Sequence, residues 1–119
     1  MDARQATFPR AARLLRPSQY TAVFARGEKF VCDGFVVIAA NNGEAHARLG
    51  LALAKRRIRR AVDRNRVKRV VRESFRHVRP DLPATDIVVL ARSRTATIDN
   101  ASLTAQLTRI WQRLARRAQ

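Results

Sequence analysis

The side chains best suited to a defined chemistry are the cations of residues 64–76. This stretch reads RNRVKRVVRESFR, and on a helix its apolar residues share one arc while cations fill the rest of the circle. Lys68, Arg72 and Arg76 follow each other at intervals of four, so they stand one turn apart on one face. Like charges at that spacing repel each other, and an anion lying along the helix relieves the repulsion. The pattern predicts a surface that binds phosphates.

Residues for acid–base, nucleophilic or metal chemistry are sparse. His46 and His77 lie far apart, and neither stands in a cluster of potential metal ligands. The nine carboxylates are scattered singly, although folding could bring two together, and there is no glycine-rich phosphate loop. Glu73 lies among arginines, which favours an intrahelical partner for Arg69 or Arg76 over a general base. We therefore predict no catalytic residue and no metal site, and a binding protein whose chemistry is supplied elsewhere.

The charge narrows the class of protein. The chain of 119 residues carries 25 Lys and Arg against 9 Asp and Glu, a net charge of +16. Residues 55–79 hold 12 of these basic residues and 2 of the acidic ones, so the excess is concentrated. A localised cationic field predicts nucleic acid or an anionic membrane surface as the partner. The length fits one domain over residues 1–119.

Targeting and redox signals are few. Cys32 is the one cysteine, so no disulfide can form within the chain, and its apolar surroundings favour a buried thiol. No apolar run approaches the ~18 residues of a membrane span, and the N-terminus lacks the apolar core of a signal peptide. We expect a soluble, cytoplasmic protein.

The elements that would position these side chains follow from periodicity and turn residues. We expect helices over residues 18–26, from Asp63 to about residue 79, and from about Ala101, and strands over residues 30–32, 35–40, 48–54 and 86–92. Ser18 and Asp63 are the predicted N-caps, with a break over residues 55–62. Glycine and alanine alternate with leucine in the third strand, which indicates close approach by another element. The order α-β-β-β-α-β-α predicts an α/β (α+β) sandwich, a single sheet with helices packed on it.

Four aromatic residues and one asparagine each have two possible roles. Tyr20, Phe24, Phe35 and Phe8 are candidates to stack on unpaired bases if the sheet face opposite the basic helix is open, and core packing is the alternative for each. Asn65 is a poor helix former on a charged face. It either helps Asp63 cap the helix or offers a donor and acceptor to a phosphate, a sugar hydroxyl or the water of a bound ion.

Residues 64–76 resemble the signature of the protein subunit of bacterial ribonuclease P. The resemblance extends over nearly the whole chain, and its further matches are Phe8, Arg13-Leu14, Tyr20 through Phe24 to Gly27, Arg48-Leu49-Gly50-Leu51, Lys55-Arg56, Ala61-Val62, and Asp86-Ile87-Val88-Val89 with Arg92. Two positions depart from the pattern. Arg57 to Arg60 fill a segment where many members have a glycine, and Ile38 stands where some have an aromatic residue.

The resemblance implies a left-handed crossover around the basic helix, against the usual rule. It implies that the protein binds the catalytic RNA, one protein to one RNA, and the single-stranded 5′ leader of precursor tRNA. It implies that the RNA, with Mg²⁺ at its own active site, removes the leader. The implied RNA-binding residues are Arg64, Asn65, Arg66, Lys68, Arg69, Arg72, Lys55, Arg56 and Arg13. The implied aromatic residues of the leader cleft are Tyr20, Phe24 and Phe8.

Two other classes stay open at this point. A basic structural RNA-binding protein of the ribosomal type would share the charge without a role in processing. A membrane-surface binder would use the same helix, with its apolar arc in lipid rather than in the core. DNA is not an expected partner.

Overall fold

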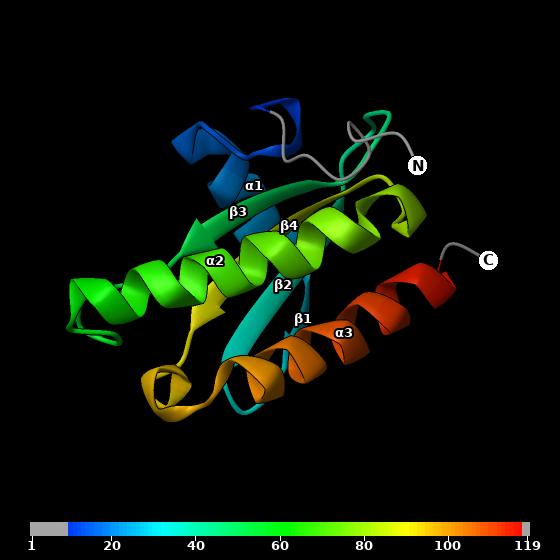
Figure 1. Cartoon of the computed structure of the whole chain (residues 1–119). Helices are drawn as coiled ribbons and strands as arrows, with labels where there is room; N and C mark the ends of the chain where they lie inside the picture. The colour runs from blue at the N-terminus through cyan, green and yellow to red at the C-terminus, as the bar shows by residue number, and fades with distance from the viewer. Residues whose placement is uncertain (1–9, 118–119) are drawn as a thin grey trace.

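The computed structural model describes residues 10–117 (Figure 1). Its helices and strands are α1 Pro17–Arg26, β1 Glu28–Val31, β2 Phe35–Asn41, β3 Arg48–Ala52, α2 Ala61–Val78, β4 Thr85–Ala91 and α3 Asn100–Arg117. Short 3-10 helices are formed by η2 Arg10–Ala12, η3 Arg79–Asp81 and η4 Thr95–Thr97. The predicted order α-β-β-β-α-β-α is confirmed.

The four strands form one mixed sheet in the order β1-β2-β4-β3. β2 pairs antiparallel with β1 and with β4, whereas β3 and β4 are parallel neighbours with Leu49 opposite Ile87. The β3–α2–β4 connection crosses in front of the sheet in Figure 1, and β4 lies on the left of β3 when both strands point upward. The crossover is therefore left-handed, whereas almost all such connections are right-handed.

One face of the sheet is covered by α2 and α3, and the main core lies beneath them (Figure 1). The apolar arc of α2 is buried there through Val67, Val71 and Phe75. All five residues of the α3 stripe are buried as well: Leu103, Leu107, Ile110, Trp111 and Leu114. Because the arc of α2 packs on the sheet, the alternative in which it lies in lipid is wrong.

Among residues 10–117, α1 and the segment just before it cover part of the opposite face. Val23 and Leu14 pack there on Ile38 and Val88. Gly50 of β3 faces the ring of Tyr20, and a Cβ at this position would come within 2.7 Å of a ring atom. The close approach predicted for the third strand is therefore confirmed. Since one short helix cannot cover a four-stranded sheet, part of this face stays open.

Both predicted N-caps are wrong. The helix expected at Asp63 begins at Ala61, with Arg60 as its N-cap, and Asp63 lies in its first turn. The reason is tertiary, because Ile58 is fully buried and anchors the preceding turn, so Val62 can lie on the helix while 61% exposed. The predicted break survives as a turn over residues 55–57.

The first helix begins at Pro17 with Arg16 as N-cap, rather than at Ser18. The Gln19 side-chain oxygen accepts hydrogen bonds from the backbone amides of Leu15 and Arg16, at 2.7 and 2.9 Å. Gln19 thus fixes the chain that enters the helix by accepting from the amides just before it. Proline at the first helical position is favourable because its missing amide hydrogen would be unpaired there.

Candidate nucleic-acid interface

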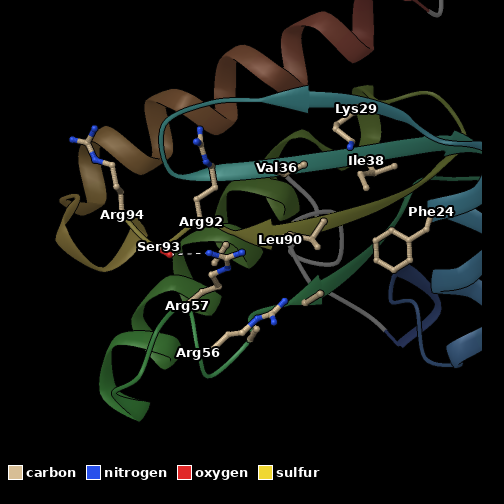
Figure 2. A pocket seen from close by; sticks show the side chains of 13 residues that line it. Phe24, Lys29, Val36, Ile38, Arg56, Arg57, Leu90, Arg92, Ser93 and Arg94 are labelled. Carbon is tan, nitrogen blue, oxygen red and sulfur yellow. Dashed lines mark hydrogen bonds between the residues drawn. The ribbon is translucent and has the colours of Figure 1, made fainter.

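The open part of the sheet forms a cleft of about 590 Å³, which we call the sheet-face cleft (Figure 2). Its lining comes from α1, all four strands and the segments after β3 and β4: Phe24, Lys29, Val36, Ile38, Ala52, Ala54, Arg56, Arg57, Leu90, Ala91, Arg92, Ser93 and Arg94. A volume in this range is typical of sites that hold small molecules or parts of larger ones.

The floor of the sheet-face cleft is apolar. Val36, Ile38 and Leu90 come from the neighbouring strands β2 and β4, and side chains alternate along a strand, so these residues face away from α2 and α3. Ile38 is only 8% exposed. The departure noted at this position therefore places an aliphatic side chain in the floor, where some relatives would offer an aromatic ring.

Phe24 lies at one end of this floor, near the end of α1, with its ring toward the cleft (Figure 2). The side chain is 48% exposed, whereas Phe35 is fully buried in the core. Of the two alternatives, core packing is therefore correct for Phe35, whereas Phe24 is not packed in the core. A half-exposed ring beside an apolar floor offers a surface on which a base can stack.

No carboxylate of residues 10–117 lines the cleft, whereas five cations do: Lys29, Arg56, Arg57, Arg92 and Arg94. Arg57 donates a hydrogen bond to the Ser93 hydroxyl at 3.1 Å, and Arg92 donates one to the Cys32 carbonyl at 2.8 Å. Arg94 forms an exposed ion pair with Asp33 at 3.1 Å. The cleft therefore combines an apolar floor with positive charge on its rim.

Sequence reasoning selected only Phe24 and Arg56 of this site. Lys29, Arg57, Arg92 and Arg94 were missed, although Arg92 belongs to the resemblance. A signal was present, because Arg57 and Arg94 lie just after the predicted third and fourth strands and Arg92 is the last residue of the predicted fourth strand. Basic residues that follow two strands gather wherever those strands are parallel neighbours, as β3 and β4 are.

A second concave surface, which we call the α2 groove, brings together five of the other ten implied RNA-binding and aromatic residues. It is lined by Arg13, Asn65, Lys68, Arg69, Arg72, Glu73 and Arg76. Arg76 and His77 hydrogen-bond Glu73, with 3.0 Å from His77 Nε2, and these bonds hold the pKa of the Glu73 carboxyl below its usual value. Glu73 is thus a helical partner of Arg76, as predicted.

Tyr20 lies beside the α2 groove rather than in the sheet-face cleft. It lines a third hollow, at β3, together with Arg13, Lys68 and Arg72 of the α2 groove. Its ring covers Gly50, and its hydroxyl donates a hydrogen bond to the Leu14 carbonyl at 3.3 Å. Tyr20 and Phe24 therefore line different surfaces.

Four predicted residues lie elsewhere. Arg64 and Arg66 of α2 hydrogen-bond backbone carbonyls of neighbouring segments. Lys55 is exposed in the turn after β3, and it lines none of the three hollows described above. Phe8 lies outside the described residues.

Potential metal ligands do not gather in the part of the chain that the structure describes. Within residues 10–117 no three His, Cys, Asp or Glu side chains come together where they could hold a metal ion. His46 Nε2 lies 3.1 Å from the Ala11 carbonyl. Separately, burial raises the pKa of the Cys32 thiol. No helix in this range is both long and apolar enough to cross a bilayer.

Comparison with known proteins decides the family. The family model described as Ribonuclease P matches residues 8–115. The chain belongs to the ribonuclease P protein family. The ribonuclease P protein component of Thioalkalivibrio sulfidiphilus is 47% identical over 108 residues, which is 91% of this chain and 90% of that protein. The component of Escherichia coli strain K12 is 43% identical over 111 residues, 93% of each.

Solved ribonuclease P proteins share the fold. A mutant of the Staphylococcus aureus protein aligns with a TM-score of 0.80 and 29% identity over 86% of each chain. The Thermotoga maritima protein aligns with a TM-score of 0.75 and 29% identity, over 85% of this chain and 96% of that one. The chain is thus a ribonuclease P component, part of an endoribonuclease complex that processes tRNA, and its partner is an RNA.

Proposed function

We propose that this ribonuclease P component binds the catalytic RNA and, in its sheet-face cleft, the single-stranded 5′ leader of precursor tRNA. The RNA subunit, with Mg²⁺ held at its own active site, hydrolyses the phosphodiester bond that frees the mature 5′ end. The protein binds and orients, one protein to one RNA, in the cytoplasm and without DNA or membrane as partner.

The observation that carries this proposal is the half-exposed Phe24 at the end of an apolar strand floor ringed by five cations. Single-stranded RNA presents aromatic bases and a charged backbone, and proteins bind it by stacking bases on aromatic rings while cations follow the phosphates. Duplex RNA is recognised by its shape and backbone instead, and an apolar floor would add nothing there.

The residues of the chain support a division of labour in which the protein does not cut. A hydrolytic site needs a general base or a bound metal to activate water. The described carboxylates and histidines do not gather in a group that could hold a metal ion. Glu73 is hydrogen-bonded by Arg76 and His77, and Asp86 is paired with Arg48. What the protein supplies instead is positive charge, which reduces the repulsion between the phosphates of catalytic RNA and substrate.

The α2 groove is the surface that we assign to the catalytic RNA. Five of its seven lining residues are cations, and Asn65 adds a neutral donor and acceptor between them. It adjoins the hollow under Tyr20 that β3 shares with α2. Catalytic RNA bound along α2 would therefore lie next to a leader bound across the sheet.

The test is the dependence of affinity on the leader. We expect the assembled enzyme to bind a precursor tRNA more tightly as its leader lengthens to cover the cleft, and to bind mature tRNA without this gain. The RNA subunit alone, measured in parallel at the same Mg²⁺ concentration, should show little dependence on leader length. A gain of equal size without the protein would remove the proposed leader contact.

A further inference from the structure

Arg64 holds the segment between β3 and α2. Its Nη1 donates hydrogen bonds to the carbonyls of Ile58 and Arg59, at 2.8 and 2.9 Å. Ile58 is fully buried and fixes the same segment from the inside. The segment also contains Arg56 and Arg57, which line the sheet-face cleft.

Arg66 holds the segment between β4 and α3. Its Nη1 donates to the Asn100 side-chain oxygen at 2.7 Å and to the Ile98 carbonyl at 3.2 Å, and its Nη2 donates to the Ala96 carbonyl at 3.1 Å. Arg64 and Arg66 are separated by about 200° around the helix, so they leave α2 on opposite sides.

The two held segments carry the cationic rim at one end of the cleft (Figure 2). They follow adjacent parallel strands, and the hydrogen bond from Arg57 to Ser93 joins them at 3.1 Å. Thr95 anchors the second segment further, because its buried hydroxyl lies within hydrogen-bond distance of the carbonyls of both Gly34 and Arg92 and can donate its proton to either. The two segments are therefore fixed to α2 and to each other, and the second is also fixed to the β1–β2 turn.

The anchoring opposes the electrostatic repulsion between the cations of the rim. Arg56, Arg57 and Arg92 bring like charges together around one cleft, and repulsion pushes them apart until an anion is bound. A guanidinium can bridge several carbonyls at once because its donors lie in a rigid plane, which an ammonium group lacks. Carbonyl groups held in this way cannot follow the repelled side chains outward.

We propose that Arg64 and Arg66 are positioning residues. From α2 they hold in place the two segments that carry the cationic rim of the sheet-face cleft. This rests on the proposed function for the role of the cleft, but not for the anchoring itself. Between the two arginines in sequence, the exposed Asn65 lines the α2 groove and remains available to RNA.

The first measurement uses the protein without RNA, so it does not depend on the proposed function. Arg66→Gln should raise hydrogen exchange at the amides of Thr97 and Ile98 by about tenfold or more, since the bonds that it removes involve a charged donor. Arg64→Gln should do the same at the amide of Ile58. Exchange in β4 should stay unchanged, as it should everywhere in the control variant Arg109→Gln.

The second measurement uses the assembled enzyme and a precursor with a long leader. Arg66→Gln should weaken binding about fivefold, yet change the slope of log affinity against log salt by much less than the ~0.7 that loss of a phosphate contact on a single strand produces. Arg94→Gln should reduce that slope by about 0.7. The double variant should lose less than the sum of the two, because a displaced Arg94 no longer contributes fully.

A milder variant keeps the test valid if Arg66→Gln fails to fold. Asn100→Ala removes the shortest bond of Arg66 and leaves every charge in place, so a weaker version of the same exchange and binding changes supports positioning. Unchanged exchange, together with a slope loss in Arg66→Gln equal to that of Arg94→Gln, would overturn it and make Arg66 a phosphate ligand. Raised exchange with leader affinity unchanged in Arg66→Gln, Arg94→Gln and Phe24→Ala would keep the anchoring and overturn the proposed function.

Discussion

The hydrophobic effect alone does not explain the placement of Phe24. A phenylalanine gains stability from burial, yet this ring is 48% exposed beside an apolar floor that has room for it. Its position near the end of α1 keeps the ring at the mouth of the cleft. The exposed surface becomes favourable once a base covers it, which links this residue to binding rather than to folding.

We predict that Phe24→Ala weakens binding of a leader-containing precursor about tenfold, because stacking of one base on an aromatic ring contributes roughly 1 to 3 kcal/mol. Binding of mature tRNA should stay the same, and Phe24→Trp should keep the leader contact. The matched control is Val31→Ala, at an apolar residue that is 56% exposed outside the cleft. Equal weakening of precursor and mature tRNA by Phe24→Ala would argue against stacking.

The residue scale also shows what a helical wheel can and cannot predict. It places Val67, Val71 and Phe75 in the core, because burial depends on the angle around the helix alone. It could not assign Arg64 or Arg66, since both lie on the polar arc. The carbonyl partners of Arg66 are 30 and 32 residues away in the sequence. Contacts between distant segments are not encoded in local periodicity.

At the scale of elements, one network joins the strands on which the crossover rests. Asp86 at the start of β4 is 8% exposed and accepts two hydrogen bonds from Arg48 of β3, at 2.7 and 2.8 Å. Asn42 donates a third at 3.0 Å and ties in the β2–β3 connection. The hydrogen bond to Asp86 is the main cause that raises the pKa of the Arg48 guanidinium.

We predict that Asp86→Ala lowers the free energy of unfolding by about 2 to 3 kcal/mol, because Arg48 would keep its charge in a partly buried site with only the exposed Glu44, 3.9 Å away, as a partner. Arg48→Met combined with Asp86→Leu should recover much of this loss, since apolar residues of similar volume need no pairing. Urea unfolding, compared at constant m value, measures both. A double variant less stable than Asp86→Ala alone would contradict the account.

Elements were predicted better than the site they build. Turn residues and apolar periodicity located the three α-helices and the four strands to within about two residues, including α3 with its five buried positions, but did not predict the short 3-10 helices. The start of α2 was wrong because the burial of Ile58 depends on the sheet, which the sequence does not display. The cleft was missed in part for the same reason, since its lining combines all four strands with α1.

At the scale of the whole molecule, the two basic surfaces approach each other along β3. The sheet-face cleft occupies one face of the sheet, and the α2 groove belongs to the layer on the other. Tyr20, Gly50 and Lys68 line the hollow where α1, β3 and α2 meet. An RNA along the groove and a strand in the cleft would therefore be held by one small protein at a fixed distance.

The net charge of +16 sets the expected response to salt. If about six cations contact phosphates, log affinity for the catalytic RNA should fall against log salt with a slope of magnitude roughly 4 to 5. Lys68→Ala in the α2 groove should reduce that slope by a little under one, whereas Arg109→Ala, on the exposed side of α3, should leave it unchanged. A slope near zero for the parent protein would exclude the ionic interface.

Cleavage of a precursor tRNA at low, near-physiological Mg²⁺ tests the central claim most directly. The bacterial catalytic RNA alone, this protein alone and the two together would be compared with the same leader-containing substrate. We predict efficient cleavage only in the mixture, because the RNA supplies the chemistry and the protein supplies the charge and the leader cleft. Cleavage by the protein alone, or a mixture no faster than the RNA, would contradict this account.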